Sequence, residues 1–163
     1  MILAATGDGL HEVGGRDTAL EGHRIDALSQ DAWGLYALAD GRSVWRRVRD
    51  RWVQVVEVEG PPGRCLLATE DGLFIGTAEA GLLRFEDGEL VPVKGFEQVD
   101  GREAWYTPWG GPPDTRSMAR DGAGRLHANV HVGGIPRSTD GGETWAPTID
   151  VDADVHQVVT HPS

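Results

Sequence analysis

Short apolar runs that close on a turn recur along the chain and predict β-strands rather than helices. Four such runs each open a repeated unit, and they lie at residues 25–31, 65–72, 117–122 and 156–162. The first three are each followed by a second apolar run, at 34–38, 73–77 and 126–130. Third strands are expected at 44–46, 81–85 and 134–138, and fourth strands at 52–58, 89–93 and 144–149.

The spacing of these units predicts an all-β fold, a β-propeller built from four-stranded antiparallel blades. Third strands begin near residues 43, 81 and 134, so the first interval is about 38 residues, close to one propeller blade. The second interval is longer because of an insertion at about residues 100–116. Three blades are expected, at about 24–59, 64–99 and 115–149, with no helix longer than two turns.

The two ends of the chain predict a further blade that is divided between them. Residues 2–13 align with 74–85, so the chain opens on a second strand, and it closes just after a first strand. A blade made of residues 155–163 plus 1–22 brings the total to four blade equivalents in one domain, residues 1–163. Joining the ends in this way removes an open sheet edge.

Four blades are few for a propeller, so the chain has the pattern of half a larger ring, as a fragment or an engineered unit would. Two copies joined head to tail would form eight blades, each copy supplying the strand that the other lacks. A closed four-bladed monomer is the alternative, and it demands a stronger tilt between blades. We expect the homodimer.

Composition suits a β-rich fold, and the net charge disfavours several classes of partner. Among the 163 residues, 23 are glycine and 9 are proline, which suits short strands joined by turns. The net charge of −11 disfavours nucleic acid and anionic membranes, which need basic faces. The lone cysteine, Cys65, lies in an apolar run and is expected to be a buried thiol. No basic-then-apolar leader and no apolar run near ~18 residues occur, so the expected location is cytoplasmic.

One eight-residue motif, S-x-D-x-G-x-T-W, predicts a specific hairpin. Its defining positions are Ser138, Asp140, Gly142, Thr144 and Trp145. The Asp140 carboxylate can accept hydrogen bonds from backbone N–H groups of its own turn, as aspartate commonly does. The indole of Trp145 can then pack beneath the hairpin.

This motif resembles the Asp-box, or BNR repeat, of sialidase-like β-propellers, and all of its defining positions match. The resemblance implies the propeller fold and a structural fastener rather than an active-site element. Sialidases also need an arginine triad, a tyrosine–glutamate pair, an aspartate acid/base and an Arg-Ile-Pro string. Here the order is Ile135-Pro136-Arg137, which is reversed. No glutamate partner can be assigned to Tyr36 or Tyr106, so sialidase activity is not expected.

Candidate binding residues come first from the strand at 126–132. Period two places His127, Asn129 and His131 on one face and apolar residues on the other. Imidazoles on one strand face can ligate a metal. The alternative is a polar face that meets water in the propeller channel.

Residues 150–156 alternate as well, and the polar members of one face are Asp150, Asp152, Asp154 and His156. An EF-hand loop is excluded, because Val155 stands where its glycine is needed and His161 where its last glutamate is needed. Since the first strand of a blade lines the channel, Asp154 and His156 can face the same opening as His131. A solvated acidic loop is the alternative.

The insertion at 101–116 carries aromatic residues on a backbone rich in glycine and proline: Trp105, Tyr106 and Trp109, followed by Asp114 and Arg116. Such a composition is typical of a loop that covers a ligand, and equally of a loop folded back on the core.

Two functions fit these observations. In the first, the chain is a non-catalytic propeller module that self-assembles into a closed ring, and this is our expectation. In the second, it is half of a propeller hydrolase or lyase, or it binds a small polar ligand through a channel-side site. The candidate residues of that site are His131, His156, Asp154, Arg116, Trp109 and Tyr106. No catalytic residue, metal ion or cofactor can be assigned, because phosphate-binding, dinucleotide-binding and nucleophile motifs are absent from the sequence, and no particular ligand is indicated.

Overall fold

The computed structural model describes residues 2–15, 17–31 and 34–161, and most of its regular structure is β-sheet. Parts of the predicted blades lie outside the described residues, namely Met1, Arg16, Ala32, Trp33, Pro162 and Ser163. The strands form four antiparallel sheets in which neighbours in space are neighbours along the chain. No helix among the described residues has the length and apolar character needed to cross a membrane.

The sheets divide the chain into consecutive units. The first contains β1 (Leu3–Ala5), β2 (Leu10–Glu12) and β3 (Thr18–Ala19). The second contains β4 (Ile25–Gln30), β5 (Leu35–Ala39), β6 (Ser43–Val48) and β7 (Arg51–Glu57). The third contains β8 (Gly63–Thr69), β9 (Gly72–Thr77), β10 (Leu82–Glu86) and β11 (Glu89–Pro92). The fourth contains β12 (Thr115–Arg120), β13 (Leu126–Val130) and β14 (Arg137–Ser138).

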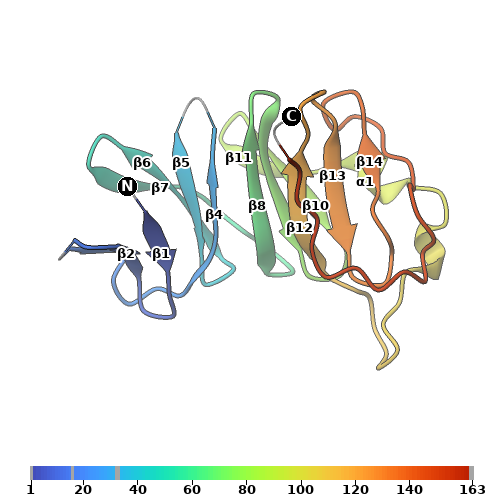
Figure 1. Cartoon of the computed structure of the whole chain (residues 1–163), viewed down its shortest axis with the longest axis horizontal. Helices are drawn as coiled ribbons and strands as arrows, with labels where there is room; N and C mark the ends of the chain where they lie inside the picture. Colours follow the sequence, from blue (N-terminus) through green and yellow to red (C-terminus); the bar gives the residue numbers. More distant parts are fainter. Residues whose placement is uncertain (1, 16, 32–33, 162–163) are drawn as a thin grey trace.

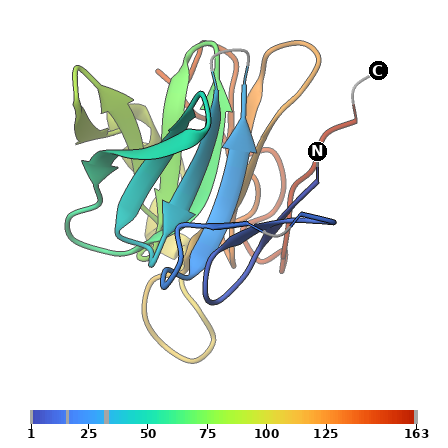
Figure 2. The same ribbon diagram turned by 90° about the vertical axis from the view of Figure 1, so that its left-hand side faces the viewer.

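The sheets follow one another in an open row. Figure 1 shows the first sheet at one end and the fourth at the other, and Figure 2 views the row from the first-sheet end. Between residues 2–15 and 155–161 the structure contains no backbone hydrogen bond. The predicted all-β architecture of antiparallel blades is confirmed, and so is the absence of long helices. The described helical segments are α1 (Lys94–Glu97) and the 3-10 turn Arg102–Ala104.

The prediction of a fourth strand at 144–149 is wrong, because these residues form no regular strand. Only an isolated bridge between Arg137 and Ala146 represents it. The next residue is Pro147, which has no N–H to continue a ladder. Thr148 instead donates its hydroxyl hydrogen to the carbonyl oxygen of Ile135 at 2.5 Å. The fourth sheet therefore has three strands rather than four.

Apolar side chains are buried between neighbouring sheets rather than within any one sheet. The first core, between the first and second sheets, contains Leu10, Ile25, Ala37 and Ala39. The second, between the second and third sheets, contains Leu38, Val44, Leu66, Leu73 and Ile75 among others. The third, between the third and fourth sheets, includes Phe74, Leu82, Phe96, Leu126, Val130 and Trp145. Consecutive residues serve different cores, as Phe74 and Ile75 of β9 do, because side chains alternate across a strand.

The short helix α1 completes the third core. Phe96 is fully buried, and its ring meets the Trp145 ring edge-on with centroids 5.2 Å apart. This approach requires glycine at position 95. A Cβ atom on Gly95 would overlap the carbonyl oxygen of Glu143 and lie 2.8 Å from its carbonyl carbon.

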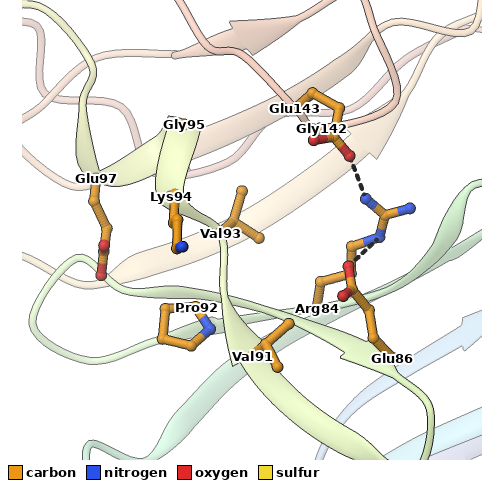
Figure 3. Close-up of a pocket in the computed structure, with 10 residues that line it drawn as sticks. All are labelled: Arg84, Glu86, Val91, Pro92, Val93, Lys94, Gly95, Glu97, Gly142 and Glu143. Carbon is orange, nitrogen blue, oxygen red and sulfur yellow. Dashed lines mark hydrogen bonds and ion pairs between the residues drawn. The ribbon is translucent and has the colours of Figure 1, made fainter.

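A groove of about 580 Å³ lies beside this contact, between α1, the β10–β11 edge and the turn at 142–143. Figure 3 shows Arg84 reaching across it to Glu143 at 2.8 Å and to Glu86 at 3.4 Å. Arg84 also donates to the carbonyl oxygen of Asp71 at 2.8 Å. Because this guanidinium is paired inside the protein, and no candidate ligand-binding residue lines the groove, we interpret it as the seam between the third and fourth sheets.

The turn at 138–145 has the hydrogen bonds that its sequence predicts. The buried Ser138 hydroxyl accepts the Gly142 N–H at 2.9 Å, and Asp140 Oδ1 accepts the Thr144 N–H at 2.9 Å. Hydrogen bonds from Thr144, chiefly from its hydroxyl, hold the pKa of Asp140 below its usual range. Trp145 is buried, and its indole N–H donates to the Gly142 carbonyl at 2.9 Å.

Replacing Gly95 by Ala is expected to lower the free energy of unfolding by about 1–3 kcal/mol, because the new methyl group meets rigid backbone. Urea titration followed by tryptophan fluorescence measures it. Gly7→Ala is the control, since a Cβ atom there has no atom within 4 Å, and it should change stability by less than about 0.5 kcal/mol. Equal stabilities for the two variants would contradict the close approach of α1.

Ser138→Ala should cost about 1–3 kcal/mol, because it leaves a buried N–H unpaired, whereas Asp140→Ala should cost about 1 kcal/mol, because its donors can turn to water. The folded pKa of Asp140 lies below its unfolded value of about 3.9, so its contribution is present at neutral pH and is lost as the pH falls through the folded pKa. The stability difference between wild type and Asp140→Ala should therefore shrink in acid. A difference that stays constant down to about pH 2 would refute this account of the turn.

Candidate functional site

The site begins with the way β13 presents its side chains. Ala128 and Val130 point into the third core and are fully buried. Asn129, and His131 just after the strand, point to the opposite side, which is the open face of the fourth sheet. His131 is buried, and its backbone N–H donates to the carbonyl oxygen of Asp114 at 3.0 Å.

The C-terminal segment lies along β12 on this open side, as Figure 1 shows. Three hydrogen bonds hold it there, two through its backbone and one through a side chain. Asn129 Nδ2 donates to the Val155 carbonyl at 2.7 Å, and the Val158 N–H donates to the Ser117 hydroxyl at 2.9 Å. Thr160 donates its hydroxyl hydrogen to the Arg120 carbonyl at 2.8 Å. These contacts position the residues just before Val158 next to the end of β13.

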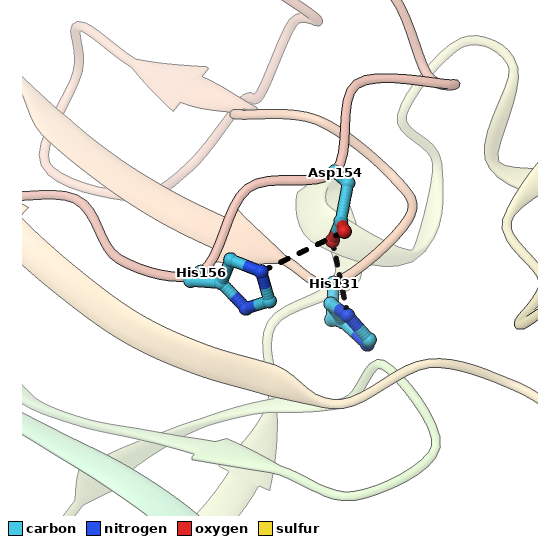
Figure 4. Close-up of side chains that lie close together, drawn as sticks. All are labelled: His131, Asp154 and His156. Atoms are coloured by element: carbon cyan, nitrogen blue, oxygen red, sulfur yellow. Dashed lines mark ion pairs between the residues drawn. The ribbon is translucent and has the colours of Figure 1, made fainter.

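Three of the predicted residues meet there. His131 Nε2 lies 3.1 Å from Asp154 Oδ1, and His156 Nε2 lies 3.6 Å from Asp154 Oδ2. Figure 4 shows Asp154 between the two imidazoles, whose ring centroids are 5.6 Å apart. The side chains of Asp154 and His156 are 62% and 73% exposed, whereas His131 is buried. The cluster is therefore accessible to solvent from the side of Asp154 and His156.

The insertion contributes an aromatic rim. The Trp109 ring lies 5.4 Å from the His131 ring, although the residue is 71% exposed. Thr107 supports the loop tip, because its N–H donates to the Gly111 carbonyl at 3.0 Å. Trp105 of the same insertion is folded back on the third core. The insertion therefore combines both predicted roles: Trp109 lies at the candidate site, and Trp105 packs on the core.

The remaining candidates lie elsewhere. Tyr106 is exposed and makes no ring contact or side-chain hydrogen bond among the interactions of the described residues. Arg116 occupies the β-bulge between Thr115 and Ser117 and is also exposed, with no ion pair in the described part of the chain. His127 shares the strand face but pairs with Asp121 at 3.0 Å, and hydrogen bonds, first from His127 and then from Arg125, hold the pKa of Asp121 below its usual range.

The predicted alternation of residues 150–156 is wrong over its first half. Residues 151–152 form a turn, and the Asp152 N–H donates to Asp150 Oδ1 at 3.0 Å, so these two carboxylates do not share a strand face with Asp154. Sequence reasoning also missed Asn129 and Ser117 as the groups that hold the segment. Cys65 is buried as predicted, and burial raises the pKa of its thiol to about 12, which makes it a poor nucleophile at neutral pH.

The arrangement offers two imidazoles and one carboxylate to a single small ligand, with the Trp109 indole beside His131. Imidazole and carboxylate together bind cations and hydrogen-bonding polar groups. All three groups come from one chain, on the side of the fourth sheet that faces away from the other sheets.

Comparison with known proteins supports the fold. No protein-family model matches the sequence, and no curated protein sequence matches it. Among solved structures, the chain is similar to the computationally designed Ika4 protein, with a TM-score of 0.58, 13% identity, and 88% of this chain and 85% of that chain covered. It is also similar to YCF48 from Cyanidioschyzon merolae (TM-score 0.54, 14% identity, 83% and 47% covered). A structure of YCF48 bound to D1 peptide matches with a TM-score of 0.50, 13% identity, and 81% and 41% covered.

These neighbours are β-propellers, and at such low identity they establish the fold alone. The chain spans less than half the length of the two YCF48 structures. With four antiparallel sheets of three or four strands, it has the architecture of a half-propeller of four blades.

Asn129→Ala is expected to release the Val155 carbonyl and loosen residues 154–158, so amide hydrogen exchange there should accelerate. Global stability should fall by only about 1 kcal/mol, because the buried Asn129 Oδ1 has no partner in the described part of the chain and its removal offsets part of the cost. Hydrogen–deuterium exchange with mass spectrometry measures both. Unchanged exchange at 154–158 would mean that Asn129 does not position the segment.

Proposed function

We propose that the chain is a non-catalytic β-propeller module that pairs head to tail with a second copy to close a ring. The observation that carries the proposal is the placement of residues 155–160. They lie against β12 where the first strand of a next sheet would lie, and they have no second strand beside them among the described residues.

A repeated contact supports this placement. Where the third sheet follows the second, the Ala68 N–H of β8 donates to the Ser29 hydroxyl of β4 at 2.8 Å. Where the C-terminal segment follows the fourth sheet, the Val158 N–H donates to the Ser117 hydroxyl of β12 at 2.9 Å. In both cases a backbone N–H donates to a serine on the preceding first strand. The segment is therefore related to β12 as β8 is related to β4.

At the other end of the row, the described part of the first sheet has a second strand without a first strand beside it. In the second, third and fourth sheets the second strand pairs on both of its sides, whereas β1 pairs only with β2 in the described residues. Apolar residues are exposed at both ends, with Ile2 69% and Val159 75% exposed. Pairing residues 155–160 of one copy with β1 of the other would satisfy both edges without new geometry.

We infer the register of this pairing from the repeats. Each observed first strand has a β-bulge just after its first residue: between Ile25 and Ala27, Gly63 and Cys65, and Thr115 and Ser117. The fourth residue of each pairs with Ala37, Ile75 and Ala128 respectively. Ala68 is the sixth residue of β8 and donates to Ser29, the fifth residue of β4. Ser117 is the third residue of β12, so the same offset makes its donor Val158 the fourth residue of the C-terminal segment and places the bulge at His156.

The matching residue on β1 follows from its turn. The N–H groups of Thr6, Thr77 and Val130 each donate to a glycine carbonyl of the following turn at 3.0–3.1 Å. Ile75 and Ala128 lie two residues before Thr77 and Val130, so the equivalent position before Thr6 is Ala4. The ungapped alignment of residues 2–13 with 74–85 is off by one residue in this strand, because the turn after Thr6 is one residue shorter than the turn after Thr77. Val158 should therefore lie opposite Ala4 of the partner subunit.

We also propose that the chain belongs to the Asp-box repeat family and that its Ser138–Trp145 turn fastens the hairpin. The hydrogen bonds of that turn support this assignment.

A second candidate function is the binding of a small polar ligand. It is favoured by the convergence of His131, Asp154 and His156, with the Trp109 indole beside His131.

A cysteine pair tests the ring. The variant Ala4→Cys/Val158→Cys should form two disulfides between two chains under mild oxidation, because directly opposed antiparallel residues have Cα atoms about 4.5–5.5 Å apart, within disulfide range. Non-reducing electrophoresis and intact mass would show the covalent dimer. Neither single variant should form it efficiently, and the buried Cys65 should take no part.

Ala4→Cys/Val159→Cys is the matched control, since the adjacent side chain points to the other face of the strand. Crosslinking that is equally efficient in the two pairs would reject the register. A disulfide that forms within one chain would favour the closed four-bladed monomer instead, and no disulfide at all would contradict the pairing.

A further inference from the structure

We propose that His131, Asp154 and His156 bind a divalent transition-metal ion, with Zn²⁺ as the best-matched ion. One ligand atom from each side chain can be chosen so that all three lie within 4.8 Å of one another. All three ligands come from one chain, so the proposal goes beyond ring assembly and does not depend on it. It rests on the second candidate function, the binding of a small polar ligand, and specifies a metal cation as that ligand.

The donor set suits such an ion. Two imidazole nitrogens and a carboxylate oxygen are ligands that zinc and its neighbours accept, whereas calcium and magnesium prefer oxygen alone. Ligand atoms about 2.1 Å from a tetrahedral zinc ion are about 3.4 Å from each other. The separations from His131 Nε2 to Asp154 Oδ1 and from His156 Nε2 to Asp154 Oδ2, 3.1 and 3.6 Å, lie close to that value. They involve different carboxylate oxygens, so binding through one oxygen requires a small movement of a ligand.

His156 is the side chain that can move to complete the coordination geometry. His131 is buried and its backbone is fixed by the hydrogen bond to Asp114, so it forms a rigid first ligand. His156 is 73% exposed and can rotate toward the shared centre. The Asn129–Val155 hydrogen bond holds the backbone between the other two ligands in place. The metal would therefore join β13 to the C-terminal segment.

Charge and access favour a cation at this position. The chain carries a net charge of −11, which raises the local concentration of divalent cations around it. Three protein ligands leave a fourth coordination position free, and the exposed side chains of Asp154 and His156 leave the cluster open to solvent. An imidazole–carboxylate–imidazole network without metal is the competing interpretation of the same contacts.

Calorimetric titration of the full chain with ZnCl₂, after removal of adventitious metal by a chelator, tests the proposal. One zinc ion per chain is expected. Asp154→Asn and His156→Ala should each weaken the affinity at least tenfold, and both positions are exposed enough for the variants to fold. His23→Ala is the matched control, because His23 and Asp40 form a histidine–aspartate pair, 2.6 Å apart, with no second imidazole beside it in the described part of the chain. Its affinity should equal that of wild type.

Fluorescence quenching locates the ion independently. Ni²⁺ bound at the cluster should quench the Trp109 indole, and the quenching should be largely lost in Trp109→Phe while the calorimetric zinc affinity is retained. Zinc binding that survives both Asp154→Asn and His156→Ala unchanged would overturn the proposal, as would the absence of binding to wild type. Equal losses in His23→Ala would show nonspecific histidine binding and overturn it as well.

Discussion

Face-to-face burial between neighbouring sheets is the interaction on which the rest of this structure depends. Among the residues that the structure describes, no sheet holds a core of its own, and each of the three cores is shared by two sheets. Strand β9 shows the reason most directly, because Phe74 and Ile75 are consecutive and each is buried in a different core. A sheet of this kind is stable only between two others.

The end sheets cannot meet that condition within the open row. The sequence of the fourth sheet is adapted to this position. Its outward side carries Asn129 of β13 and the buried His131 just after β13, where a core strand would carry apolar residues. The C-terminal segment covers this polar side through hydrogen bonds rather than apolar packing. The same end of the molecule therefore holds both the candidate ligand cluster and the strand position that a second copy would complete. Ligand binding and ring closure would act on the same few residues, 154–158.

The strand rhythm and the 138–145 motif were sufficient to predict the sheets and one hairpin in detail, because apolar alternation and turn chemistry are local properties. They failed where a local interruption breaks the period. Pro147 ended the predicted fourth strand, and the turn at 151–152 separated Asp150 and Asp152 from Asp154. Alternation also predicted His127 and His131 on one face, but it could not show that they have different partners, Asp121 for His127 and Asp154 for His131. Arg116 was expected at the site, but a bulge, which period two cannot reveal, determines its direction.

The association state of the intact chain tests the central claim, that the half-propeller is completed by a second copy. Sedimentation velocity at micromolar concentration would measure it. The account predicts a single compact species of about twice the chain mass of 17.6 kDa, with no monomer and no larger assemblies, because a ring of two pairs both ends of each row. A folded species at the mass of one chain would contradict it.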